Sequence, residues 1–211
     1  MSDPLSDSIG TFADLVSAGT STPGGGSVAA YSGVLAASLG QMMCNLTIGK
    51  AKYAEVESRV KEMKADLERL GARLRQLIAE DAASFERVLT TYRLPKESDE
   101  QKADRKRRID IATRGAVDVP LETAQRALEV LKRLADLAKI GNPNALPDVT
   151  VGSRLAETAV KGAYYNIGIN LKTLADRTAA AIIERQTTEL IIETERLAAE
   201  IEATMLKQME S

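Results

Sequence analysis

The sequence predicts an all-α protein, a long-helix up-and-down bundle, and three observations lead to this fold class. Ala, Leu, Glu, Lys and Arg dominate the 211 residues. No segment of useful length alternates apolar and polar residues as a β-strand does. Glycine and proline residues divide the chain into rods. Because 44% of the residues are hydrophobic, residues 1–211 can bury the core of a single helical domain.

The first two helices are expected on either side of a glycine-rich loop. Ser6 and Ser8 can cap a short helix that ends near Ala18. Residues 19–26 contain the stretch TSTPGGG, whose middle cannot be helical. A second helix is therefore expected over about residues 27–48.

This second helix is uncharged, because no Asp, Glu, Lys or Arg lies between Asp14 and Lys50. Its apolar run is long enough to cross a bilayer. Polar residues such as Gln41 and small residues such as Gly33 favour instead a tightly packed central helix of a bundle. We therefore expect no membrane span.

A long third helix is expected over about residues 54–92, because its apolar residues alternate spacings of four and three. A fourth is expected over about residues 98–140, and Pro120 inside it predicts a kink or a break just before the proline. The heptad positions of the third helix are Val56, Val60, Met63, Leu67, Leu70, Leu74 and Leu77.

The segment GNPNALPD, residues 141–148, is the clearest loop of the chain. Two helices, over about residues 148–174 and 176–209, complete the bundle, with Asp176 as a cap or hinge. A helix of about 35–40 residues is about 55 Å long, which is more than one compact domain of this size spans. Such rods usually pair, so we expect a homodimer or a larger assembly that forms through helix–helix packing.

Composition excludes several classes of function. The 28 Lys and Arg against 30 Asp and Glu leave a net charge of −2, which argues against nucleic-acid binding by bulk electrostatics. Histidine is absent, which removes Ser-His-Asp and Cys-His systems and most zinc sites, and the carboxylates are scattered over separate helices, so we expect no metal. We also expect no cofactor. The single cysteine, Cys44, cannot form an intramolecular disulfide, and the N-terminus lacks the features of a signal peptide. A cytoplasmic location is expected.

The first candidate site is the glycine-rich turn, Pro23, Gly24, Gly25, Gly26 and Ser27. Backbone N–H groups at the start of a helix can bind an anion or the polar edge of a ligand. The spacing is not that of a P-loop or of a dinucleotide fingerprint. The alternative is a tight turn that lets two helices cross closely.

Asp81 is the second candidate. It follows Leu74 and Leu77 at the next step of the apolar stripe, where an apolar residue is expected. A buried carboxylate is costly unless it is paired or hydrogen-bonded, so it is seldom accidental. In the alternative, Asp81 lies at the solvated edge of a shifted stripe made of Ile78, Ala82, Phe85 and Leu89.

Amide side chains form a third group. Asn142 and Asn144 lie in one loop with Asp148, and Asn166 and Asn170 stand four residues apart, hence on one helix face. These amides could bind the donor and acceptor edge of a heterocycle or cap a loop across the bundle.

Basic residues form a fourth group. Lys50 and Tyr53 follow the second helix, and Lys96 follows Pro95. Each lysine can bind a carboxylate or a phosphate, or can simply complement a helix dipole. The run KADRKRR at residues 102–108 indicates a solvated helix turn or, alternatively, a clamp for an acidic tail.

Seven segments, taken in order, resemble the methenyltetrahydrofolate cyclohydrolase and formiminotetrahydrofolate cyclodeaminase family. They span nearly the whole chain, and one departure is Pro147, which stands before Asp148 where the family usually has serine. The segments are TPGGGSVAA (22–30), CNLTIGKAKY (44–53), EDAASFERV (80–88), YRLPK (92–96), VPL (119–121), GNPNALPD (141–148) and GAYYNIGINLKTLAD (162–176).

The resemblance implies an all-helical dimer that acts on a one-carbon tetrahydrofolate. One branch of the family hydrolyses 5,10-methenyltetrahydrofolate to 10-formyltetrahydrofolate. The other branch releases ammonia from the 5-formimino compound and forms the methenyl compound. The transferase domain of bifunctional members is absent from these 211 residues, and the segment at 44–53 favours the hydrolase.

The resemblance also implies residue roles. Asp81 comes first and Asp148 second as general base or stabiliser of the substrate cation, and Lys50 is the proton donor or the anchor of the folate glutamate tail. The residues expected to bind the substrate are Pro23, Gly24, Gly25, Gly26, Ser27, Thr47, Tyr53, Lys96, Asn142, Asn144, Asn166 and Asn170.

Two other functions stay open at this point. The first is the ammonia-releasing activity on the same scaffold, since both reactions pass through the same bicyclic cation. The second is a non-catalytic helical scaffold whose heptad helices bind partner helices.

Overall fold

The computed structural model describes residues 9–210, and within this range every long element is a helix, as the sequence predicts. Short 3-10 turns connect two pairs of these helices. The elements are α1 (Ile9–Ser17), α2 (Gly25–Thr47), η1 (Ala51–Tyr53), α3 (Glu57–Tyr92), α4 (Asp99–Ile140), η2 (Pro143–Ala145), α5 (Leu146–Leu171) and α6 (Arg177–Met209).

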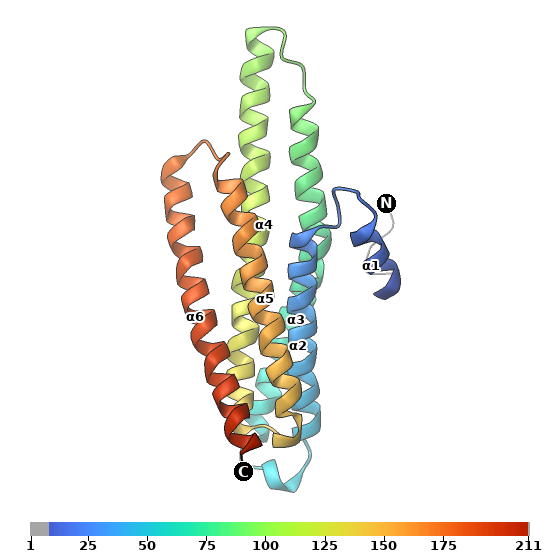
Figure 1. Ribbon diagram of the computed structural model, residues 1–211, viewed down its shortest axis with the longest axis vertical. Helices are drawn as coiled ribbons and strands as arrows, with labels where there is room; N and C mark the ends of the chain where they lie inside the picture. Colours follow the sequence, from blue (N-terminus) through green and yellow to red (C-terminus); the bar gives the residue numbers. More distant parts are fainter. Residues whose placement is uncertain (1–8, 211) are drawn as a thin grey trace.

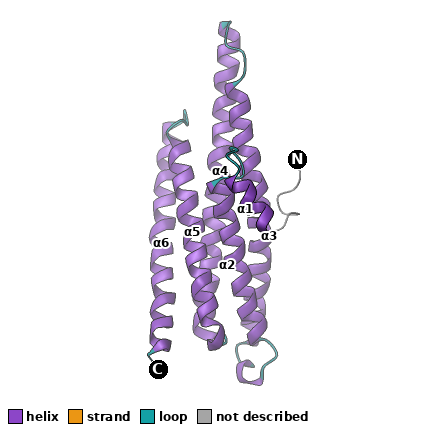
Figure 2. Ribbon diagram, turned by 45° about the vertical axis from the view of Figure 1, so that its right-hand side comes forward, coloured by secondary structure: helices purple, strands orange, loops and turns teal. Residues whose placement is uncertain are grey.

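The long helices α2 to α6 run alternately up and down, so the all-α bundle is confirmed (Figure 1). Helices α2, α3, α4 and α5 pack against one another, and α6 lies against α4 and α5. The α3–α4 hairpin projects beyond the other helices (Figures 1 and 2). Helix α1 lies near the start of α2, where the rings of Phe12 and Tyr31 are 5.3 Å apart.

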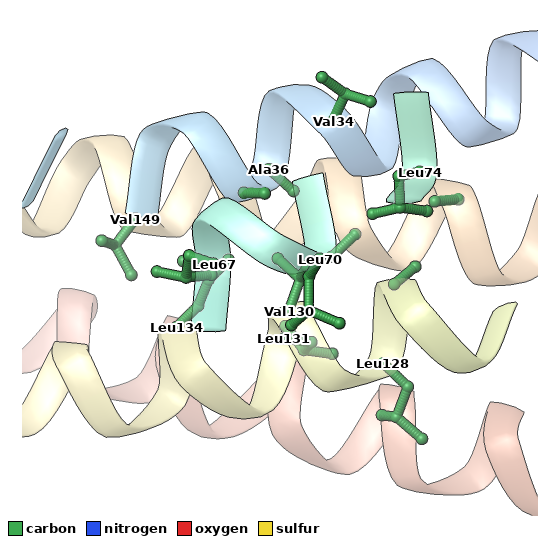
Figure 3. Close-up of a cluster of buried hydrophobic side chains, with 14 of the residues drawn as sticks. Val34, Ala36, Leu67, Leu70, Leu74, Leu128, Val130, Leu131, Leu134 and Val149 are labelled. Carbon is green, nitrogen blue, oxygen red and sulfur yellow. The ribbon is translucent and has the colours of Figure 1, made fainter. Parts of the chain in front are cut away.

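The core lies where the heptad stripe of α3 meets α2 and α4. Leu67 and Leu74 of α3 and Leu134 of α4 are fully buried (Figure 3). Helix α2 contributes small residues, and a Cβ added at Gly40 would lie 2.8 Å from side-chain carbons of both Leu67 and Leu134. The small residues therefore let α2 pack closely in the centre of the bundle. None of the helices within residues 9–210 is long and apolar enough to span a membrane.

Several predicted boundaries need correction. Helix α2 begins at Gly25, two residues before the expected start, so two of the three glycines are helical. The expected loop of residues 141–148 is mostly helical, because η2 and the first turn of α5 lie inside it. Asp176 caps α6 as expected, since its side chain accepts a hydrogen bond from the backbone N–H of Ala179. The proposed caps Ser6 and Ser8 lie outside the described residues.

Of the kink or break expected at Pro120, the break does not occur, because α4 continues through the proline from Asp99 to Ile140. A proline leaves the carbonyl four residues earlier without its helical N–H partner. That carbonyl belongs to Ala116, and it accepts a hydrogen bond of 2.8 Å from Nδ2 of Asn170 on α5. The neighbouring helix thus replaces the missing donor.

Candidate functional site

Helix α2 separates the sequence-predicted site residues into two groups. The group at its N-terminal end is Pro23, Gly24, Gly25, Gly26, Ser27, Asp81, Asn166 and Asn170. The group at its C-terminal end is Thr47, Lys50, Tyr53, Asn142, Asn144 and Asp148.

The two groups are far apart within one chain. The 23 residues of α2 are about 34 Å long at a rise of 1.5 Å per residue (Figure 1). Lys96 is remote from both groups, because it lies in the connection between α3 and α4 at the tip of the hairpin. Within one chain, Asp81 therefore does not share a pocket with Asp148, Lys50 or Lys96.

Asp81 lies directly against the first turn of α2. A Cβ added at Gly26 would lie 2.6 Å from Cγ of Asp81 and closer still to Oδ1. Only glycine leaves room for the carboxylate at this place. The glycine-rich segment is thus explained by close approach, and the group that approaches is the Asp81 carboxylate.

Ser27 holds this carboxylate. Its hydroxyl donates to Oδ2 of Asp81 at 2.9 Å and lies 3.2 Å from the carbonyl oxygen of Ile78. The backbone N–H of Ser27 also donates to Asp81. The first N–H groups of a helix have no partner within the helix, so Asp81 accepts from one of these groups at the start of α2.

The environment shifts the protonation of Asp81. Burial raises the pKa of the Asp81 carboxyl, and the two hydrogen bonds from Ser27 partly oppose this rise. The stripe of α3 includes the fully buried Ile78, whereas Phe85 is 42% exposed. Asp81 is therefore an acidic residue at the buried edge of the stripe and not on a solvated face.

The two asparagines of α5 lie beside this turn. Nδ2 of Asn166 lies 3.9 Å from the position of a Cβ at Gly25, and it donates to the carbonyl oxygen of Gly162. Nδ2 of Asn170 donates to Ala116, as described above. Both amides therefore have a structural use, and no described residue donates a hydrogen bond to either Oδ1 atom.

At the opposite end of α2, Asn142 joins three segments. Its backbone N–H donates to Oγ1 of Thr47 at 3.0 Å, and its Nδ2 donates to the carbonyl oxygen of Leu46 at 3.1 Å. Its Oδ1 accepts from the backbone N–H of Asn144 at 3.1 Å and from the hydroxyl of Tyr53 at 3.4 Å. The polar atoms of this buried side chain are thus used within the chain, which is the capping role that the sequence left open.

Lys50 and Asp148 share that end. Lys50 is exposed, and Asp148 is half-buried in the first turn of α5. Within the described part of the chain, neither residue forms an ion pair with another side chain.

The basic run at residues 102–108 is a solvated helix turn, as one of its two interpretations expects. Arg107 and Arg108 pair with Asp104, and Lys102 pairs with Asp99. No group of three or more His, Cys, Asp or Glu residues that could hold a metal ion occurs within residues 9–210.

A cleft that the sequence did not reveal opens beside the glycine-rich loop that precedes α2. Its volume is about 1200 Å³, and it runs from Pro23 and Ile78 between Arg87 of α3 and Arg108 of α4. Alanines of α3 line much of it. Its lining comes from α1, α3, α4 and the glycine-rich loop, so no local motif marks it.

Comparisons with known proteins all point to one family of proteins. The family model described as formiminotransferase-cyclodeaminase matches residues 8–189. A methenyltetrahydrofolate cyclohydrolase of Methylorubrum extorquens is 40% identical over 174 residues, which are 82% of this chain and 84% of that protein. The formimidoyltransferase-cyclodeaminase of Rattus norvegicus is 32% identical over 195 residues, which are 92% of this chain but 36% of that protein.

A solved structure shares the fold. The crystal structure of formiminotetrahydrofolate cyclodeaminase from Thermotoga maritima matches with a TM-score of 0.87 and 25% sequence identity, covering 96% of this chain and 98% of that one.

Proposed function

Since this chain belongs to the formiminotransferase-cyclodeaminase family, we propose that it hydrolyses 5,10-methenyltetrahydrofolate to 10-formyltetrahydrofolate. The 40% identity with a methenyltetrahydrofolate cyclohydrolase, over most of both chains, supports this choice. The observation that carries it is the partly buried Asp81 carboxylate against the glycine turn.

The chemistry of the reaction suits such a carboxylate. The substrate carries a positive charge that is delocalised over N–C–N, and water attacks the central carbon. The water oxygen bonds to this carbon while a proton leaves for the base. The hydroxyl group of this adduct then gives up its proton as one carbon–nitrogen bond breaks, so that the formyl C=O forms and the leaving ring nitrogen takes up a proton.

Asp81 can serve as this base. The adjacent cation favours its ionised form, whereas burial raises its pKa toward the range in which a carboxylate accepts a proton effectively. Its two hydrogen bonds to Ser27 fix its orientation. Gly24, Gly25 and the free amide oxygens of α5 would contact the substrate.

The second candidate is formiminotetrahydrofolate cyclodeaminase activity. The relative from Rattus norvegicus and the structure from Thermotoga maritima both carry this activity in their names. The same carboxylate would assist, because both reactions pass through the methenyl cation. We further propose that the protein is a homodimer that acts without a cofactor.

Incubation of the purified protein with each substrate distinguishes the candidates. Loss of the methenyl absorbance without ammonia release is expected, whereas ammonia release from the 5-formimino compound identifies the deaminase. A thermal-shift titration with a reduced folate tests the non-catalytic scaffold, because a ligand at about 100 times its Kd stabilises the folded state by about 2.7 kcal/mol. No turnover and no shift would retire both enzymatic proposals.

A further inference from the structure

Beyond Asp81, the apolar stripe of α3 is no longer covered by α2. The stripe continues from Asp81 to Phe85, Val88 and Tyr92, at spacings of four, three and four residues. The first turn of α2 lies beside Asp81, and α3 extends past it into the projecting hairpin (Figures 1 and 2). Phe85 and Tyr92 are consequently 42% and 48% exposed, whereas Leu77 at an earlier position is fully buried. We call Phe85, Val88 and Tyr92 the hairpin stripe.

The hairpin stripe matches in length the part of a reduced folate that does not react. One of the two nitrogens on the reacting carbon carries a p-aminobenzoyl ring, and a glutamate follows through an amide bond. Ring, amide and glutamate together are as long as three to four residues of extended chain, roughly 10–14 Å. Tyr92 stands eleven residues after Asp81, which is about 16 Å along α3. A substrate that reacts at Asp81 can therefore lay its ring and glutamate along this stripe.

Phe85 occupies the position that the ring would reach first. It stands four residues after Asp81, about 6 Å further along α3. Two aromatic rings attract each other in offset or edge-to-face arrangements, in addition to the apolar surface that they bury. Val88, at the next step of the stripe, is a half-buried apolar neighbour. The near half of the stripe thus offers an aromatic ring and an aliphatic side chain to the p-aminobenzoyl group.

A cation lies at the far end of the stripe. The guanidinium carbon of Arg105 on α4 lies 5.6 Å from the centre of the Tyr92 ring, and Nη2 donates to the Tyr92 carbonyl oxygen at 3.1 Å. Within residues 9–210, its buried Nε has no hydrogen-bond partner, and the adjacent carboxylate of Asp104 pairs instead with Arg107 and Arg108. A buried donor without a partner is costly, and a guanidinium binds a carboxylate through paired N–H groups. Arg105 is therefore suited to an acidic ligand.

We propose that the hairpin stripe holds the p-aminobenzoyl-glutamate half of the substrate, with Phe85 against the ring and Arg105 on a glutamate carboxylate. This inference rests on the proposed function, and it makes Arg105 the residue that distinguishes folates with a glutamate from those without one. Arg105 is remote from the reacting carbon beside Asp81. It therefore acts on substrate affinity and not on the chemical step.

The large cleft between α3 and α4 is the competing surface of the hairpin. Arg107 and Ile111 line it, but neither Asp81 nor Phe85 does, so a substrate in this cleft would not reach the carboxylate. Arg107 and Ile111 consequently provide matched controls, since they lie on the same hairpin and are an arginine and an exposed apolar residue.

Two substrates test Arg105, namely 5,10-methenyltetrahydrofolate and 5,10-methenyltetrahydropteroate, which lacks the glutamate. In R105Q, KM for the first substrate should rise about tenfold or more, while kcat and both constants for the second stay within about twofold. R105K keeps the charge but loses the paired N–H groups, so its KM should rise less. R107Q should leave KM for both substrates within about twofold. Equal changes for both substrates in R105Q would indicate a structural role and would overturn the proposal.

Phe85→Ala tests the ring contact and leaves Arg105 in place. Both substrates contain the ring, so KM should rise about fivefold for both. Ile111→Ala, at a 66% exposed position, should change neither. A larger effect of I111A or R107Q would place the substrate in the cleft. A changed sedimentation coefficient of F85A with unaltered KM would mean that a protein covers the stripe, and either result would overturn the proposal.

Binding measurements keep the test independent of turnover. In titration calorimetry, the wild-type protein should bind tetrahydrofolate about tenfold more tightly than tetrahydropteroate, and R105Q should bind both equally. This result in a protein without turnover would retire the proposed function and retain the hairpin stripe as a binding site. Equal affinity of the wild-type protein for the two compounds would overturn the role of Arg105, whatever the turnover.

Discussion

The two ends of α2 use polar side chains in opposite ways. At the C-terminal end, Asn142 is buried and its donors and acceptor are all used within the chain. At the N-terminal end, Asp81 is hydrogen-bonded as well, yet burial raises its pKa. Satisfied neutral groups stabilise a fold, whereas a partly desolvated carboxylate lowers stability and is expected where it has a chemical role.

Asp81→Asn should have the largest effect, and it tests whether the polar group at the N-terminal end of α2 has a chemical role. The substitution removes the proton acceptor while it keeps a similar shape, so kcat should fall about a hundredfold or more with unchanged helical circular dichroism. The matched control is Asp118→Asn, which removes the exposed partner of Arg114 on α4 and should leave kcat within about twofold. Equal turnover of the two variants would contradict the role of Asp81.

Gly26→Ala should have the next largest effect. Its new Cβ would overlap the Asp81 carboxylate and displace it, so we expect kcat to fall about tenfold or more. Gly168→Ala is the control, because a Cβ there meets nothing within 4 Å and should stabilise α5 by about 1 kcal/mol. If G26A retained full activity, the close approach of Gly26 and Asp81 would be structural only.

Much of the fold could be predicted from the spacing of apolar residues. The stripe from Val60 to Leu77 on α3 is buried as expected, and Asp81, which interrupts this stripe, is partly buried, as one of its two interpretations expects. The spacing of apolar residues indicates which face of a helix is buried, so it singles out Asp81. It does not indicate that Ser27 and Gly26 contact the Asp81 carboxylate.

The rest could not be predicted, because it depends on contacts between distant segments. The continuation of α4 through Pro120 requires an amide from α5, and nothing near Pro120 in the sequence indicates Asn170. The separation of Asp81 from Asp148 follows from the length of α2, which sequence motifs do not measure. Motifs that occur together in a family can therefore lie at opposite ends of one long helix when the chain folds.

At the C-terminal end of α2, Asn142→Ala should affect stability more than catalysis. The change leaves the carbonyl of Leu46 and the N–H of Asn144 without their partner, which costs about 2 kcal/mol and lowers Tm by roughly 4–8 °C. Turnover at 25 °C should stay within about threefold of wild type. Asn45→Ala, at an exposed position of α2, should leave Tm within about 2 °C, and an equal loss in both variants would argue against the capping role.

The smallest effect concerns the pH dependence of stability. A carboxyl whose pKa is raised by folding binds its proton more tightly in the folded state, so its contribution to stability is present below its ordinary pKa of 3.8 and is lost as the pH rises through the raised value. D81N removes this loss, so its Tm should exceed that of wild type at pH 7, and the difference should shrink toward pH 4. The opposing contribution is attraction between the ionised carboxylate and the start of α2. A D81N protein that is less stable than wild type at pH 7 would show that this attraction outweighs desolvation, and the carboxylate would then stabilise the fold, as Asn142 does at the other end.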